Sequence, residues 1–433
     1  MFGMKQCLLA AAMLFGAAMC HGQWVRTNGL SGYSVSCLAE GDDTLFAGTR
    51  HGAFRTTDDG NGWTAVNEGL TDTTVLSFAF MPAAGGGTVC FAGTGGGVFR
   101  STNGGAVWTS SNDGLPSGNV NTLAVFPLTD DTMALFAGVY DLVNGGGIYR
   151  STDGGAHWSP AMTGLTHHDV RSLVRLMSGD TPRLYAATYG GGVFLSGDNG
   201  GTWSAENTGL SSPYVAALAG CSAAGRLFAA TNGGGVYRST DLGGNWNQVN
   251  DGITNMIVNA LIVCSSHGTA DSVRLAAGSG WSGVFASSNS GGGWSQENTG
   301  LTTSQINALH LSHDRRTLFA GTDDGVWRRP LAEVLTDVPL EGPGAPARFR
   351  LEPNYPNPFN ASTTIRFKIP EKGAVLLAVH DLLGREVDRL MNDEREAGEH
   401  RFRFDASALP GGVYFARLSW AGGAIVRKMV LLK

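Results

Sequence analysis

The sequence predicts an all-β protein: a seven-bladed β-propeller closed by its own N-terminal strand, followed by a small Ig-like β-sandwich. Short phrases rich in Val, Phe, Tyr and Leu, separated by Gly, Asn and Asp, recur along most of the chain and favour short antiparallel strands. The phrase "LFAGT" and its variants occur seven times, and seven tryptophans recur at a matching place, six of them after a Gly-rich turn. After residue 348 a different set of strand phrases predicts the sandwich.

Each repeat unit contains four phrases, which predict the four strands of one blade. The first resembles "VNTLAV" (120–125), the second is "LFAGT", the third is "GGVFRS", and the fourth joins a Trp to "NxGL". The seven fourth-phrase tryptophans are Trp24, Trp63, Trp108, Trp158, Trp203, Trp246 and Trp294.

One repeat is divided between the two ends of this region. The chain opens with an isolated fourth phrase, "QWVRTNGL" (23–30), and the last unit, "LFAGTDDGVWRR" (318–329), stops after its third phrase. A ring in which the N-terminal strand completes the last sheet removes two exposed sheet edges at once. The sequence therefore predicts a closed propeller rather than a linear solenoid.

The turn before most of these tryptophans follows the pattern S/T-x-D/N-x-G-x-x-W, and we call its copies the repeated turns. An Asp or Asn in each can accept backbone N–H groups, and the Gly can take positive φ. These acceptors are Asp58, Asn103, Asp153, Asp198, Asp241 and Asn289.

The repeated turns resemble the Asp-box (BNR) repeats of sialidases, sortilin-type receptors, xyloglucan-cleaving endoglucanases and photosystem II assembly factors. The resemblance covers about residues 23–329. It implies that the repeated turns stabilise the propeller on the face opposite the ligand site, so we assign them a structural role.

Four segments are expected: a signal peptide (1–22), the propeller (23–329), a linker (330–348) and the sandwich (349–433). Lys5, an apolar run and "CHG" before Gln23 are typical of a secretory signal. The phrases "NYPNPFNASTTI", "LLGREV", "GGVYFARL" and "RKMVLLK" resemble the type A C-terminal sorting domain of type IX secretion cargo. That resemblance implies a secreted or outer-membrane surface protein of a Bacteroidetes-type Gram-negative bacterium, with the type IX machinery as a partner.

Composition argues against several other classes. Residues 1–347 carry 16 Lys and Arg against 26 Asp and Glu, without a basic stripe, so we expect no nucleic acid partner. No C-x-x-C occurs, and the consecutive residues "HHD" (167–169) cannot readily converge on one ion, so we expect no metal and no cofactor. We also expect no transmembrane segment in the mature chain, and four free, mostly buried cysteines.

Two sets of loops should share the propeller face opposite the repeated turns, where propellers commonly bind ligands. Besides Arg50, His51, Asp72, Asn232 and Met256, these loops carry the aromatic and imidazole side chains that we take as ligand-binding candidates: Tyr33, Tyr140, His167, His168, Tyr189, Tyr214 and Trp281. Planar rings suit glycan or protein ligands. We therefore expect a non-catalytic binding, adhesion or scaffold module. The alternative is a glycoside hydrolase of endoglucanase or sialidase-like type that uses Asp141, Asp323 and Asp324.

Overall fold

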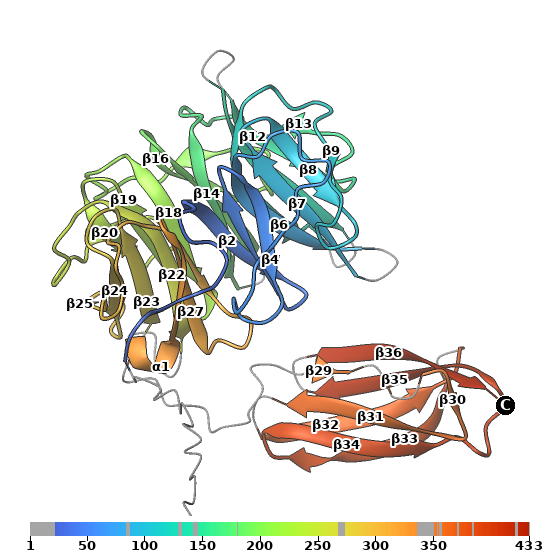
Figure 1. Cartoon of the computed structure of the whole chain (residues 1–433). Coiled ribbons are helices and arrows are strands. Elements are labelled where there is room, and N and C mark those ends of the chain that lie inside the picture. The colour runs from blue at the N-terminus through green and yellow to red at the C-terminus, as the bar shows by residue number, and fades with distance from the viewer. Residues whose placement is uncertain are drawn as a thin grey trace, which may run out of the picture.

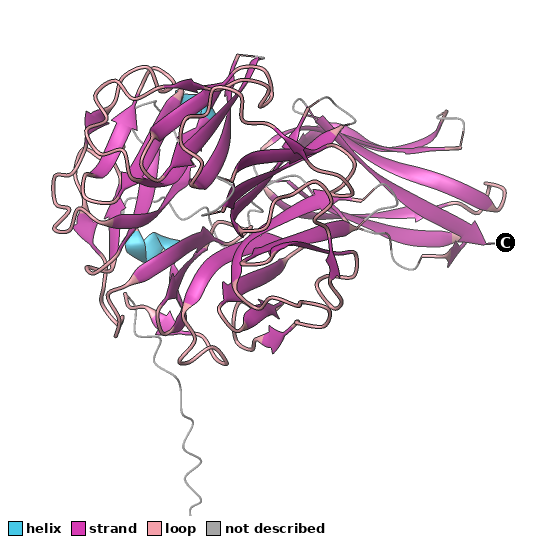
Figure 2. Ribbon diagram, turned by 90° about the horizontal axis from the view of Figure 1, so that it is seen from above, coloured by secondary structure: helices cyan, strands magenta, loops and turns pink. Residues whose placement is uncertain are grey.

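The computed structural model describes residues 22–83, 87–128, 132–141, 146–179, 181–266, 273–335, 350–352, 354, 357–369, 372–382, 385–420 and 423–432. Within these residues almost every regular element is a β-strand, as Figures 1 and 2 show. The helical elements there are η1 (Ser222–Ala224) and α1 (Leu331–Val334). Apart from Gly22, the predicted signal peptide lies outside the described residues.

Seven four-stranded antiparallel sheets make up the propeller. Blades 1 to 3 consist of β2 (Val35–Gly41), β3 (Thr44–Thr49), β4 (Gly52–Thr56) and β5 (Thr64–Ala65); β6 (Val75–Pro82), β7 (Thr88–Thr94), β8 (Gly97–Ser101) and β9 (Thr109–Ser110); and β10 (Asn119–Pro127), β11 (Met133–Tyr140), β12 (Gly147–Ser151) and β13 (Ser159–Pro160). Blades 4 to 6 consist of β14 (Val170–Ser178), β15 (Thr181–Thr188), β16 (Gly192–Ser196) and β17 (Ser204–Ala205); β18 (Val215–Cys221), β19 (Arg226–Thr231), β20 (Gly235–Ser239) and β21 (Asn247–Gln248); and β22 (Val258–Ser266), β23 (Val273–Ser279), β24 (Val284–Ser287) and β25 (Ser295–Gln296).

Blade 7 is the divided repeat. It joins β26 (Ile306–Leu311), β27 (Thr317–Thr322) and β28 (Gly325–Pro330) to the N-terminal β1 (Val25–Arg26), in the order β1-β28-β27-β26. The side chain of Trp24 is buried and donates its Nε1–H to the carbonyl of Glu297 at 2.6 Å. The first strands of neighbouring blades contact one another around the ring, and β2 contacts both β6 and β26. The predicted closure by the N-terminal strand is confirmed.

The Gly of "LFAGT" allows neighbouring blades to approach closely. A Cβ atom added at Gly93 would lie 2.8 Å from a methyl carbon of Val120, and one at Gly138 would lie 2.9 Å from the Cβ of Val170. These valines lie at the start of the first strand of the next blade. The close packing of protein interiors leaves no room for an extra methyl group at such a contact.

In the repeated turns the structure forms the same hydrogen bonds in six copies. In blade 3, the hydroxyl of Ser151 donates to Oδ1 of Asp153 at 2.8 Å and accepts from the N–H of Gly155 at 2.9 Å. The N–H of His157 then donates to the same Oδ1 atom at 3.0 Å. Trp158 next donates its Nε1–H to the carbonyl of Ser111, which belongs to the preceding blade, at 2.8 Å. The turn therefore also ties neighbouring blades together.

The segment after β28 differs from the predicted linker. The linker was expected to start at residue 330, but α1 follows directly, and Leu331, Val334 and Leu335 are each 3% exposed. They pack in one hydrophobic cluster with Trp24 and Trp327. The blade 7 core therefore continues at least to Leu335, because these three apolar side chains cover the closing sheet.

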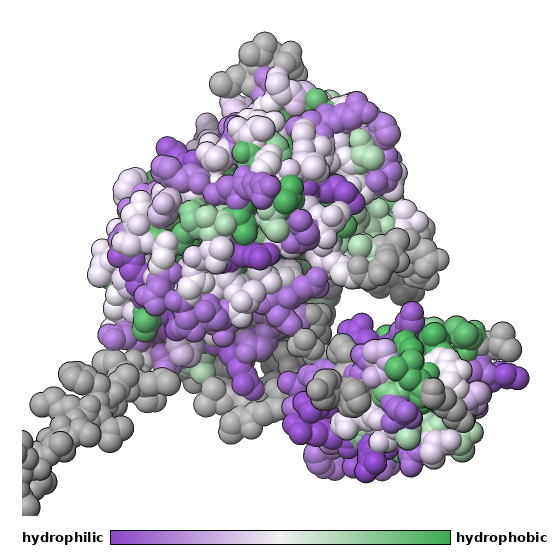
Figure 3. All heavy atoms as spheres, turned by 45° about the vertical axis from the view of Figure 1, so that its right-hand side comes forward, coloured by the Kyte–Doolittle hydropathy of each residue, from purple (hydrophilic) through white to green (hydrophobic). Residues whose placement is uncertain are grey.

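The C-terminal module contains two sheets. One consists of β29 (Arg350–Leu351), β31 (Ser362–Ile369) and β34 (Gly398–Asp405); the other consists of β30 (Phe359–Asn360), β36 (Gly423–Leu432), β35 (Gly412–Trp420), β32 (Gly373–His380) and β33 (Glu386–Arg395). Inward-facing residues of both sheets form one core, which includes Phe367, Leu377 and Phe404. This arrangement confirms the predicted Ig-like sandwich. Figure 3 shows a group of hydrophobic atoms on the surface of this module. Its large exposed hydrophobic side chains among the described residues are Leu382, Val426 and Leu432.

Candidate functional site

The two predicted sets of loops meet on one face of the propeller, which we call the mouth. Middle hairpins join the second and third strands of each blade, and inter-blade loops join the fourth strand to the first strand of the next blade. Because antiparallel strands alternate in direction, both sets lie at the end opposite the repeated turns. The two sets are bonded to each other: Gly190 and Gly192 of one hairpin donate their N–H groups to the carbonyl of Pro213 at 3.0 and 2.9 Å.

The large exposed apolar side chains of the propeller are concentrated in one part of the mouth. Tyr189 is 38% exposed, Tyr214 47%, Met256 37% and Trp281 63%. Tyr189 and Trp281 stand on the middle hairpins of blades 4 and 6, and Tyr214 and Met256 on the loops that lead into blades 5 and 6. We call these four residues the aromatic arc. In the described propeller residues, the other large exposed hydrophobic side chains are Val25 and Val107.

Polar groups beside the aromatic arc are bonded mainly to one another. The rings of Tyr189 and Tyr214 lie 5.1 Å apart, and Asn232 donates to the Tyr189 hydroxyl at 2.8 Å. The guanidinium of Arg171 lies 5.3 Å from the centre of the Tyr189 ring and forms a 2.7 Å ion pair with Asp169. Sequence reasoning overlooked Arg171. Arg171 directly follows Val170, the first residue of the first strand of blade 4, where the strand has a bulge. This position at the start of a first strand is the signal that could have placed Arg171 at the mouth.

The two predicted histidines occupy the loop that leads into blade 4. His167 is exposed and lies against Gly191, where an added Cβ would come within 2.6 Å of its ring. His168 is half-buried, and Thr166 lies 3.2 Å from Nδ1 of His167. Among the residues that the structure describes, no three His, Cys, Asp or Glu side chains are grouped so that they could hold a metal ion.

Tyr33 and Tyr140 lie apart from the aromatic arc. Tyr33 is half-buried and packs edge-on against His51 at 5.4 Å and Phe54 at 5.2 Å. It belongs to the core cluster of blade 1. Tyr140 is half-buried at the end of β11, just before a segment (142–145) that lies outside the described residues.

The three candidate catalytic carboxylates belong to blades 3 and 7. Asp141 is 8% exposed and lies 3.5 Å from the hydroxyl of Ser117. Asp323 accepts a hydrogen bond from the Thr303 hydroxyl. Asp324 forms an ion pair with Arg26 of β1 and accepts from the N–H of Gly32 at 2.7 Å. Asp324 thus takes part in ring closure.

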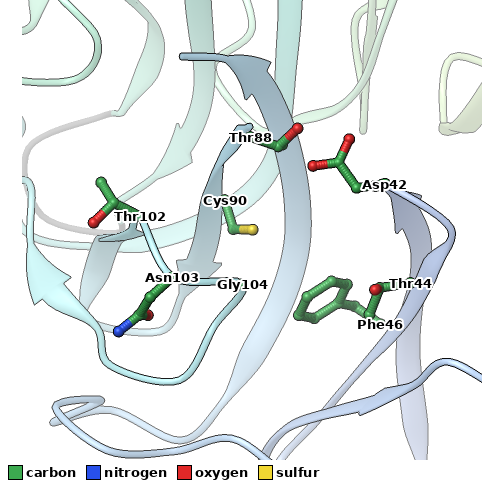
Figure 4. Close-up of a pocket in the computed structure, with 9 residues that line it drawn as sticks. Asp42, Thr44, Phe46, Thr88, Cys90, Thr102, Asn103 and Gly104 are labelled. Carbon is green, nitrogen blue, oxygen red and sulfur yellow. The ribbon is translucent and has the colours of Figure 1, made fainter. Parts of the chain in front are cut away.

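A separate pocket lies on the opposite face, between blades 1 and 2, with a volume of about 280 Å³ (Figure 4). Its lining includes Asp42 from the β2–β3 turn, Phe46, and Asn103 from a repeated turn. Cys90 also lines it, and burial raises the pKa of this thiol to about 11. A thiol with so high a pKa is unreactive at neutral pH. Burial also raises the pKa values of Cys37 and Cys264 to about 12. The four described cysteines are free.

The family comparison identifies the C-terminal module. Residues 354–432 match the model of the secretion system C-terminal sorting domain. The chain is therefore an exported β-propeller with a type IX sorting module, and it is a secreted or surface protein of the Bacteroidetes type. No helix in the described residues is long and apolar enough to span a membrane. A search of curated proteins gives no match.

Solved structures share the fold at low sequence identity. The extracellular domain of the putative hybrid two component system BT3049 from B. thetaiotaomicron has a TM-score of 0.55 and 14% identity over 95% of this chain and 57% of its own. The GH74 xyloglucanase from Xanthomonas campestris has a TM-score of 0.54 and 16% identity over 94% of this chain and 75% of its own.

YCF48 bound to D1 peptide has a TM-score of 0.53 and 18% identity over 71% of this chain and 96% of its own. The chain spans 57% and 59% of the first two structures that it matches. At these identities the comparisons establish a propeller fold, and a fold alone does not define an activity.

Proposed function

We propose that this protein is a surface or secreted binding module, which holds a glycan or protein ligand over the aromatic arc of its propeller mouth without cleaving it. The observation that carries this proposal is the clustering of exposed apolar side chains. Four of the six large exposed hydrophobic residues in the described propeller belong to blades 4 to 6 of one face. Exposed apolar groups that gather in this way mark interaction sites, whereas scattered ones do not.

The mouth is rigid where the aromatic arc stands on it. In blade 5 the N–H groups of Gly233 and Gly235 donate to the carbonyl of Met256, both at 2.9 Å, and in blade 6 Gly283 donates to Ser304 at 2.8 Å. Each hairpin tip is therefore fixed to the next inter-blade loop. A preorganised surface loses little conformational freedom when it binds a ligand, which favours affinity.

The hydrolase alternative receives less support from the carboxylates. Glycoside hydrolysis needs two carboxyl groups that face each other across the sugar, at roughly 5–10 Å. The contacts of Asp324 with Arg26 and Gly32 neutralise and hold it within the closing blade. Asp141 is buried in blade 3.

Binding and cleavage can be tested on the same polymers. The full chain is applied to a glycan array and to a panel of secreted-protein and extracellular-matrix ligands, and the bound polymers are then assayed for released oligosaccharides. We expect binding without release, and loss of binding in Trp281→Ala. Because Trp281 is 63% exposed, its removal should leave the melting temperature unchanged.

A matched control is available on the opposite face. Val107 is exposed in a repeated turn, so Val107→Ala removes an exposed apolar side chain away from the mouth. It should bind like the parent protein. Released oligosaccharides, with activity lost in Asp141→Asn, would establish the hydrolase instead. Equal loss of binding in both alanine variants would rule out a site at the aromatic arc.

A further inference from the structure

We propose that the ligand of the aromatic arc is a polypeptide segment with large apolar side chains and a net positive charge, rather than a glycan. This inference rests on the proposed binding function of the mouth and specifies its partner. It depends on the kinds of side chain in the arc, on their existing hydrogen bonds and on the charge of the propeller.

The exposed side chains of the arc are those that protein interfaces favour. Tyr189, Tyr214, Met256 and Trp281, together with Arg171 beside them, all belong to the residue types enriched at the centre of protein–protein contacts. Met256 is informative because a flexible thioether adapts to varied apolar side chains but offers a sugar ring neither a flat surface nor a directional hydrogen bond.

Several polar groups around the arc already have partners within the protein. Arg171 is paired with Asp169, and the other oxygen of Asp169 accepts from Asn121 at 3.0 Å. The hydroxyl of Tyr189 accepts from Asn232 at 2.8 Å. A glycan is recognised through many directed hydrogen bonds to its hydroxyl groups, whereas an apolar side chain needs a dry, closely packed surface. These internal bonds therefore favour the polypeptide.

The net charge of the propeller indicates the charge that its partner should carry. Residues 23–347 contain 26 Asp and Glu against 15 Arg and no Lys. At the mouth, Asp72 on the loop into blade 2 and Asp323 on the middle hairpin of blade 7, next to blade 6, have no cationic partner among the described residues. Arg50 lies on the middle hairpin of blade 1, where its carbonyl accepts from Thr73. A negative field of this kind attracts cationic partners and raises their association rate at low salt.

The test uses a library of random twelve-residue peptides displayed on phage, selected against the full chain. Amine-reactive biotin attaches the protein largely through its C-terminal module, because beyond the predicted signal peptide its lysines are Lys368, Lys372, Lys428 and Lys433. All four lie in the C-terminal module, so the side chains of the propeller stay unmodified. Selected peptides are then synthesised, and their Kd values are measured by fluorescence anisotropy.

We expect selected peptides to combine aromatic or aliphatic residues with Lys or Arg. Trp281→Ala and Met256→Ala should raise Kd by about thirty-fold and about ten-fold, as for residues at the centre of an interface. Val107→Ala on the opposite face should change Kd less than about two-fold. Raising the salt concentration from 50 to 200 mM should slow association several-fold.

Tyr189→Phe separates the two kinds of ligand, because it keeps the ring and removes a hydroxyl whose O–H can still donate to a glycan. A polypeptide bound through apolar contacts should lose less than about three-fold in affinity. Arc-dependent binding to a glycan, with no peptide enriched, would overturn this inference and leave the proposed function standing. If neither peptides nor glycans bind in a manner that Trp281→Ala abolishes, both proposals fail.

Discussion

At the scale of single residues, each repeated turn is held by two acceptors of backbone N–H groups, a buried hydroxyl and an exposed carboxylate. Ser151 is 2% exposed, and its hydroxyl accepts the N–H of the buried Gly155. The carboxylate of Asp153 is 43% exposed and binds groups that water can also reach. The hydroxyl should therefore matter more for stability than the Asp that defines the motif.

Replacing these two residues in turn tests this difference. Ser151→Ala leaves a buried N–H without an acceptor and should lower the free energy of unfolding by about 1–3 kcal/mol. Asp153→Ala should cost about 1 kcal/mol, because water replaces the lost acceptor. Urea unfolding followed by Trp fluorescence measures both values. A larger loss in Asp153→Ala than in Ser151→Ala would contradict this account.

His157 gives the same turn a dependence on pH. Its ring lies 2.8 Å from Asp153 and 3.3 Å from Asp113 of the preceding blade, and its hydrogen bond and attraction to Asp153 raise the pKa of His157 above 6.5. A raised pKa stabilises the fold below the unfolded value, and this contribution disappears as pH rises through the folded value. The bonds to His157 and Ser151 lower the pKa of Asp153 far below 3.8, so its contribution is present above that value and lost only in strong acid.

We therefore expect the melting temperatures of the parent protein and His157→Asn to differ at pH 5 and to converge by pH 9. The difference should be small and sensitive to salt, since the pair is exposed. Differential scanning calorimetry at both pH values gives the comparison. A difference that grew as the pH rose would have the wrong sign for this mechanism.

At the scale of elements, the short strand β1 has an effect larger than its two residues suggest. It pairs with β28 and brings Trp24 into a cluster with Trp327 and Leu331. The ion pair between Arg26 and Asp324 adds a polar contact at the same junction. Without β1, the last sheet would keep an open edge and an uncovered core.

Trp24→Ala should accordingly destabilise the protein by about 3–5 kcal/mol, and deletion of residues 23–30 by at least as much. Trp63→Ala is the matched control. Trp63 occupies the corresponding place in blade 1 and donates to the Thr27 hydroxyl at 3.1 Å, but it is only half-buried. Its loss should cost less. A deletion variant that melted within a degree of the parent would mean that the ring does not depend on this strand.

At the scale of the whole molecule, the propeller and the C-terminal module have separate cores. The core of the module is formed by residues between 351 and 431, and none of these residues takes part in the seven propeller clusters. Their charges also differ: residues 348–433 carry 14 Lys and Arg against 10 Asp and Glu, whereas the preceding chain is acidic. The two parts should therefore be separable in folding but not in export.

Removing residues 349–433 should leave the melting temperature of the propeller unchanged and prevent its appearance at the cell surface. Immunodetection on intact and fractionated cells of the native host follows the protein, which should accumulate in the periplasm. Trp281→Ala with an intact C-terminal module serves as the control and should reach its normal location. Normal surface display of the shortened chain would mean that export does not use this module.

The sequence by itself determined the number of blades, their closure and the sorting module. These features follow from local patterns, because each strand phrase and each turn is specified by residues a few positions apart. Counting these phrases and their tryptophans gives the number of blades. The extent of blade 7 was harder to predict, because α1 is four residues long and its place in the core depends on Trp24, more than 300 positions earlier.

Only the tertiary structure decided which mouth residues lie together. Tyr189, Tyr214 and Trp281 were predicted as candidates, and folding places Met256, Asn232 and Arg171 in the same region. Tyr33 packs into blade 1 instead, and Asp324 pairs with Arg26, 298 positions away in the chain. Local periodicity assigns a residue to a loop, but the rotation between blades and the packing of each side chain determine its neighbours. Those contacts join distant segments, and no pattern within one repeat encodes them.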